Sequence, residues 1–173
     1  MKFHNLITNI FLIASVSAME SYDDGVGARK HRRSSVPQFT FRSAFDYSIG
    51  IIELGGGDEY GIIEAKTLRT VRNAINIGVI TQDELDYVLY RSLQYNLLKI
   101  ARCVLTISDS TKITPSQRAI NDEVGLIFDS QLDPIYRARV SHLFMQVASG
   151  QVGSSRQINC AIKKYKKFGR PWF

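Results

Sequence analysis

Two carboxylates around a run of three glycines are the candidate for catalysis in this sequence. Glu53 precedes Gly55-Gly56-Gly57 and Asp58 follows it, so the carboxylates flank a segment that can bend sharply. Paired carboxylates can act as general acid and general base, as in the hydrolysis of a glycosidic bond. The other interpretation is a turn between two helices, with Asp58 capping the second helix. The turn is favoured because other residue types that catalysis needs are sparse, so no catalytic residue is assigned.

Metal and cofactor sites are not predicted. His142 is the single histidine after residue 33, and Cys103 and Cys160 are the only cysteines. A zinc site needs three or four such ligands brought together. The glycines are not followed by the Gly-Lys-Ser/Thr sequence of a phosphate-binding loop. His142 is interpreted as a surface or half-buried structural residue.

Basic and aromatic side chains alternate in the C-terminal tail, residues 163–173. This composition suits an anionic surface such as phospholipid head groups or a sulfated glycan. The alternative is a solvated basic helix end, with the tryptophan folded back on the core. The residues predicted to contact an anionic surface are Lys163, Lys164, Lys166, Lys167, Arg170 and Trp172.

The N-terminus has the layout of a secretory signal peptide over residues 1–18. Lys2 and His4 precede an apolar run over residues 6–14, and small residues follow up to Ala18. The run is too short to span a bilayer, which distinguishes it from a transmembrane helix. We therefore expect cleavage after Ala18 and a secreted, extracellular protein that is not transmembrane. The alternative is a buried N-terminal helix.

A second processing signal follows in residues 19–33. This polar stretch contains glycines and aspartates and ends in Arg29-Lys30-His31-Arg32-Arg33. Flexible polar segments are preferred sites of proteolysis, and proteases of dibasic specificity cut after paired bases. We expect cleavage after Arg32-Arg33, which makes residues 19–33 a short propeptide. The alternative is an uncut basic arm that binds polyanions.

The two cysteines are predicted to form a disulfide, because secretion places them in an oxidising compartment. A Cys103–Cys160 bond would close a long loop, and chain-entropy arguments assign such a loop about 4 kcal/mol of stabilisation. The alternative is a pair of unpaired, buried thiols.

The remaining sequence, residues 34–162, predicts one all-α domain: a compact bundle of five or six amphipathic helices. The chain is 45% hydrophobic, as is usual for a globular protein, and much of its net charge of +6 falls in the tail. Thr81-Gln82-Asp83-Glu84 and Thr114-Pro115-Ser116-Gln117 are predicted capping boxes, and Gly78 is a predicted helix end. Apolar residues recur at helical spacing over the ranges 39–54, 59–77, 81–104, 115–128, 134–149 and from 155 onward. Residues 39–54 also fit the alternation of a strand, and a helix is preferred there because the rest of the domain is predicted to be helical.

These features favour a small secreted interaction protein without catalysis, effector-like or ligand-like, that acts on an extracellular or host protein partner. The alternative function is a secreted, glycosidase-like hydrolase that uses Glu53 and Asp58. A carboxylate-lined cleft at the glycine turn would support the hydrolase.

Overall fold

The computed structural model describes residues 40–54, 58–108, 112–129 and 131–167. These residues form seven helices and no strands, which confirms the all-α class and exceeds the expected number of helices. The predicted signal peptide and propeptide lie outside the described residues. The helices are α2 (Phe41–Leu54), α3 (Asp58–Ile77), α4 (Gln82–Gln94), α5 (Leu98–Leu105), α6 (Gln117–Ile127), α7 (Pro134–Ser149) and α8 (Ser155–Lys166).

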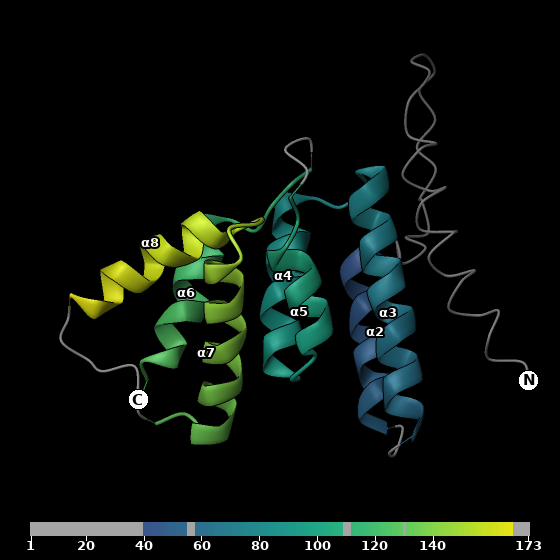
Figure 1. Cartoon of the computed structure of the whole chain (residues 1–173). Helices are drawn as coiled ribbons and strands as arrows, with labels where there is room; N and C mark the ends of the chain where they lie inside the picture. Colours follow the sequence, from purple (N-terminus) through teal and green to yellow (C-terminus); the bar gives the residue numbers. More distant parts are fainter. Residues whose placement is uncertain (1–39, 55–57, 109–111, 130, 168–173) are drawn as a thin grey trace, which may run out of the picture.

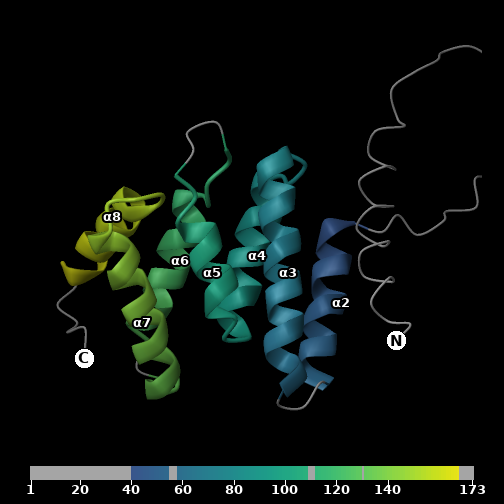
Figure 2. The ribbon, with the colours of Figure 1, turned by 45° about the vertical axis from the view of Figure 1, so that its right-hand side comes forward.

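The helices stack as three successive pairs, α2 with α3, α4 with α5, and α6 with α7 (Figure 1). Contacts between the pairs define two layers: α2, α4 and α6 form one layer, and α3, α5 and α7 form the other. The last helix, α8, packs across α6 and α7 at one end of the stack (Figure 2). One continuous hydrophobic core runs through the stack, from Phe45 in α2 to Ile162 in α8.

Several helix ends follow the predicted capping chemistry. The Thr81 hydroxyl accepts a hydrogen bond from the Glu84 amide, and the Glu84 carboxylate accepts from the Thr81 amide, which completes the capping box of α4. Asp133 caps α7, with Pro134 in its first turn. Helix α6, in contrast, is capped by Ser116 and begins at Gln117, so the predicted capping box over 114–117 is wrong.

The helix expected over 81–104 is instead two helices, α4 and α5. Asn96 adopts a left-handed conformation with φ of 56°. The Leu97 amide donates to the Ser92 carbonyl at 2.7 Å and the Asn96 amide donates to the Leu93 carbonyl at 3.1 Å. This pair of bonds is the Schellman motif that ends helices, and asparagine tolerates the left-handed position better than most residues. The chain reverses there, and Leu97 is buried in the core.

Gly153 fixes the start of α8 against the end of α5. Its φ is +55°, and a Cβ atom there would lie 2.4 Å from the Leu105 carbonyl oxygen. The adjacent Ser154 amide donates to the same oxygen at 3.0 Å. A side chain at position 153 would separate the two backbones, so glycine is required both by the dihedral angle and by the close approach.

The predicted disulfide is wrong, because both cysteines are free thiols. Cys103 lies half-buried on α5, while Cys160 is exposed on α8. Helix α8 buries its Ile158, Ala161 and Ile162 face against α6 and α7 and leaves Cys160 on the solvent side. The alternative of two buried thiols is also wrong for Cys160.

Among the described residues, no helix combines the length and the apolar composition needed to cross a membrane.

Candidate functional site

A groove between α4 and α6 is the candidate site. It consists of two adjoining hollows, of about 540 and 320 Å³, that share Tyr90, Glu123 and Leu126 in their walls. Arg42 of α2 lies at one end and Tyr136 of α7 at the other. We call this feature the α4–α6 groove. It lies on the layer formed by α2, α4 and α6, and its walls come from segments that are distant in sequence.

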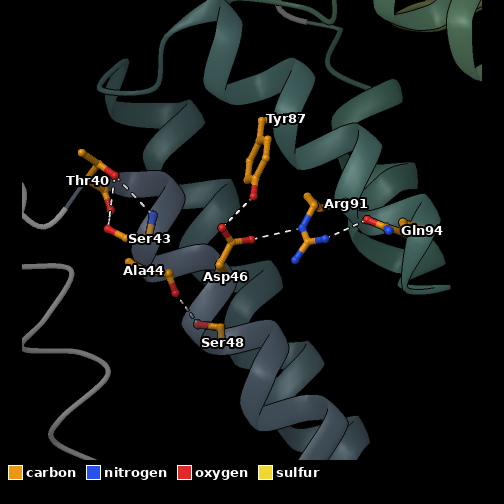
Figure 3. A network of polar contacts seen from close by, with 8 residues as sticks. All are labelled: Thr40, Ser43, Ala44, Asp46, Ser48, Tyr87, Arg91 and Gln94. Carbon is orange, nitrogen blue, oxygen red and sulfur yellow. Dashed lines mark hydrogen bonds and ion pairs between the residues drawn. The ribbon is translucent and has the colours of Figure 1, made fainter.

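The α4 wall is held in place by a polar network centred on Asp46 of α2 (Figure 3). The Tyr87 hydroxyl donates to Asp46 Oδ2 at 2.6 Å, and Arg91 Nε donates to Asp46 Oδ1 at 3.1 Å. Arg91 also donates to the Gln94 side chain at 2.8 Å. Since Tyr87 and Gln94 both line the groove, the network positions two groove residues from a neighbouring helix. Desolvation, and then the hydrogen bond to Asp46, raise the pKa of Tyr87.

The α6 wall contains a buried carboxylate, Glu123. Ile120, Val124 and Ile127 form the apolar stripe of α6, and Glu123 falls on the same face. Glu123 is 6% exposed and lines both hollows. Its carboxylate has no hydrogen-bond or ion-pair partner in the part of the chain that the structure describes.

Burial changes the acidity of this glutamate. Desolvation, assisted by the negative charge of Asp122, raises the pKa of Glu123 to about 7. Burial, with the charge of Glu123 and then Tyr90, raises the pKa of Tyr136 to about 12. The groove therefore holds a carboxylate that is partly charged near neutral pH and lies in the same hollow as Tyr136, which stays protonated there.

A second buried glutamate shows what Glu123 lacks. Glu64 of α3 is 5% exposed, but Lys99 Nζ of α5 lies 3.3 Å from its carboxylate. The lysine side chain is 67% exposed, so it reaches the carboxylate from the solvent side. A buried carboxylate is ordinarily paired in this way, since an unpaired buried charge is strongly unfavourable. The α4–α6 groove offers Glu123 no such cation.

The groove as a whole carries more acidic than basic groups. Arg42 is occupied, because it donates to the Asp83 carbonyl at 3.0 Å and its guanidinium lies 5.0 Å from the Tyr87 ring centre. Arg118 is 92% exposed and lies 4.0 Å from the Asp122 carboxylate. The carboxylates in the walls are Asp83, Asp86, Asp122, Glu123 and Asp133, against the two arginines Arg42 and Arg118. The groove is therefore suited to a cationic ligand.

The predicted catalytic pair lies elsewhere. Glu53 falls in the last turn of α2 and Asp58 is the first residue of α3, so the segment between them connects two helices. The expected role of Asp58 as the cap of the second helix stays a prediction. The glycines and the side chains of Glu53 and Asp58 lie outside the described part of the structure.

The lysines of the predicted tail belong to α8 and its end. Lys163, Lys164, Lys166 and Lys167 are all exposed, whereas Ile158, Ala161 and Ile162 of α8 are buried. Five predicted site residues lie outside the described residues: Ala18, Arg32 and Arg33 of the processing sites, and Arg170 and Trp172 of the tail.

His142 is an exposed residue of α7 whose ring nitrogen lies 3.2 Å from the Gln146 side-chain amide. In the described ranges, no group of three or more His, Cys, Asp or Glu residues is arranged to hold a metal ion.

The groove was not anticipated from the sequence, although one signal was present. Glu123 interrupts the apolar stripe of α6, and an ionisable residue at a core-facing position indicates a special environment. Comparison of the chain with protein-family models, curated proteins and solved structures gives no match. The geometry of the groove is therefore the basis for a proposed function.

Proposed function

We propose that this chain is a small secreted interaction protein, effector-like or ligand-like, that binds an extracellular or host protein partner through the α4–α6 groove. The partner inserts a basic side chain, and the site performs no catalysis. The observation that carries this proposal is the buried, unpartnered carboxylate of Glu123 in the groove walls. Stacked helical pairs commonly bind partners on the extended surface that stacking creates.

The surroundings of Glu123 favour an arginine or lysine as the inserted group. Leu126 is 38% exposed and Tyr90 is 46% exposed, so both offer apolar surface to the stem of a long side chain. Tyr90 and Tyr136 also present aromatic rings, which attract a cation. The charged head group would then pair with Glu123, where partial desolvation strengthens a charge-assisted hydrogen bond.

Binding is favoured over hydrolysis at this groove because three of the four other carboxylates in its walls, Asp86, Asp122 and Asp133, have partners within the fold. Asp86 accepts hydrogen bonds from the Gln82 side chain and the Ser116 amide, and Asp133 caps α7. Asp122 is exposed and lies beside Arg118. A general acid with the raised pKa of Glu123 would still need a second carboxylate that acts on the substrate.

The basic side of α8 supports a second contact, with an anionic glycan or membrane surface. Four lysines are exposed together on α8 and its end, whereas Ile158, Ala161 and Ile162 of that helix are buried. Adjacent cations contribute about 1 kcal/mol each at an anionic surface. Replacing the four lysines with glutamine should abolish retention on heparin at moderate salt while leaving the helical circular dichroism unchanged. Unchanged retention would contradict this contact.

Secretion and processing are proposed from the N-terminal sequence. N-terminal sequencing of protein from the culture medium should find chains that begin at Met19 or Ser34. Chains retained in the cell that begin at Met1 would contradict secretion. A start at Met19 with no shorter form would contradict only the cleavage after Arg33.

The groove is tested by fluorescence anisotropy at physiological salt, with a fluorescein-labelled tetra-arginine peptide. The protein is the full chain with Arg29, Lys30, Arg32 and Arg33 replaced by glutamine, so that these four bases cannot compete with the peptide for the groove. Glu123→Gln should weaken binding at least tenfold, because it removes the charge that the guanidinium pairs with. Asp122→Asn is the matched control, since it removes one charge from the adjacent, exposed position, and it should change the affinity less than threefold. Equal affinity of the Glu123→Gln variant and its parent with the four glutamines would refute the proposed site.

A further inference from the structure

We propose that the groove has a ligand within the chain itself: the basic cluster of residues 29–33 occupies the α4–α6 groove and blocks it until the chain is cut after Arg33. This inference rests on the proposed function, because it assumes that the groove binds basic side chains. It adds the identity of the first occupant and the event that releases the site.

The chain enters the fold beside the groove. Helix α2 begins at Phe41, and Arg42 in its first turn lines the groove and donates to the Asp83 carbonyl of α4. The chain that leads to residues 29–33 therefore starts from the end of the groove formed by α2 and α4. Any segment directly before α2 has a high effective concentration at this site.

The connection is long enough to reach Glu123. Residues 34–39 join the basic cluster to Thr40, and six extended residues span roughly 20 Å. Along α4, Tyr90 lies about 10 Å beyond Asp83, from the helical rise of 1.5 Å per residue. Tyr90 and Glu123 share both hollows. A segment that leaves the start of α2 can therefore place a basic side chain beside Glu123 without disturbing the helix.

The charges are complementary. The cluster carries Arg29, Lys30, Arg32 and Arg33, whereas acidic groups outnumber basic ones in the groove walls. The other run of bases, in Lys163–Lys167, is held on α8 and its end, which packs across α6 and α7. The cluster before α2 is thus the basic segment best placed to supply the cation that Glu123 lacks.

Cleavage would open the groove by changing an intramolecular ligand into an intermolecular one. Hydrolysis of the Arg33–Ser34 bond adds the hydroxyl of water to the Arg33 carbonyl carbon and a proton to the Ser34 nitrogen. Before cleavage, a short linker gives the cluster an effective concentration of order millimolar. After cleavage, the released segment is diluted to the concentration of the protein, so a partner competes with it easily.

The test compares the tetra-arginine peptide on the uncut full chain and on a neutral-arm variant, in which the four bases of the cluster become glutamine. The neutral-arm variant should bind the peptide about tenfold more tightly, as expected when a cis ligand of millimolar effective concentration is removed. Adding Glu123→Gln to the neutral-arm variant should abolish that gain. The neutral-arm substitutions are Arg29→Gln, Lys30→Gln, Arg32→Gln and Arg33→Gln.

A variant with Lys163, Lys164, Lys166 and Lys167 replaced by glutamine is the matched control. It removes the same number of positive charges from the other end of the molecule, so it corrects for general repulsion of the cationic peptide. Its affinity should stay within twofold of that of the unmodified chain. An equal increase in peptide affinity in both variants would overturn the proposal that the basic cluster occupies the groove. The proposal would also be overturned if the neutral-arm variant showed no increase in affinity while Glu123→Gln still weakened peptide binding. If Glu123→Gln has no effect in either background, the proposed function fails as well.

Discussion

Replacing Glu123 with glutamine should stabilise the protein at pH 8 while it weakens binding of a cationic ligand. The carboxylate is buried without a partner, and its pKa is raised from 4.5 to about 7. The folded protein therefore holds this proton more tightly than the unfolded chain does. As pH rises from 4.5 to 7, the unfolded chain loses the proton first, so the free energy of unfolding falls across that window and is constant above it.

The magnitude follows from the size of the shift. A shift of one pKa unit corresponds to 1.36 kcal/mol, so ionised Glu123 destabilises the fold by about 3 kcal/mol at pH 8 and by under about 1 kcal/mol at pH 5. Glutamine has nearly the same shape and no charge, so Glu123→Gln should recover most of this difference at pH 8. Tyr90, Asp133 and Tyr136 line the same hollow as Glu123, and they are present in both proteins.

The assay is urea denaturation followed by helical circular dichroism at pH 5 and pH 8. It is carried out in the neutral-arm background, so that no cation of the cluster neutralises the carboxylate. Asp122→Asn is the control, since its parent side chain is 70% exposed and should change stability little at either pH. The reasoning is refuted if the glutamine variant and its parent show the same pH dependence, or if Asp122→Asn reproduces the gain.

Three further predictions concern the fold. Gly153→Ala should destabilise the protein by several kcal/mol in urea denaturation, because its Cβ would meet the α5 backbone. Gly50→Ala is the control: nothing lies within 4 Å of its Cβ, so it should be neutral or stabilising by up to about 1 kcal/mol. Equal changes in stability for the two variants would contradict the close approach of Gly153 to the α5 backbone. Asn96→Val should lower stability by about 1–2 kcal/mol and Asn96→Gly should not, as judged by melting temperature; equal melting temperatures would exclude a required left-handed residue. Reductant should leave the melting temperature unchanged and a thiol reagent should label Cys160 faster than Cys103, whereas a drop in melting temperature would indicate a disulfide.

The sequence alone predicted the helices and many of their ends, because these depend on local chemistry. Thr81 with Glu84, and Asp133 with Pro134, satisfy the first amides of α4 and α7 within one turn. Gly78 has φ of +73° and ends α3 with the same pair of hydrogen bonds that ends α4. Apolar spacing was enough to place most of the helices because each one buries a single face.

The break between α4 and α5 could not be seen in the spacing. Leu93, Leu97, Ile100 and Val104 continue at helical intervals across it, and all four are buried. The chain buries them from two helices instead of one, with Asn96 at the reversal. The stacking of helices into pairs depends on this reversal. The same apolar residues could be buried by one long helix or by two shorter ones, and their spacing does not distinguish the two arrangements. The disulfide prediction failed for a related reason, since the distance between α5 and α8 is set by how the pairs stack.

The groove was decided by tertiary structure alone. Glu64 and Glu123 both lie on the apolar side of a helix, and the sequence offers no way to tell them apart. Packing of α3 on α5 brings Lys99 to Glu64, whereas packing of α4 against α6 brings Tyr90 to the hollows that Glu123 lines and leaves Glu123 without an ion-pair partner among the described residues. The interaction of a buried charge depends on what lies opposite it. The tertiary contacts of the stack therefore make one glutamate structural and leave the other available to a ligand.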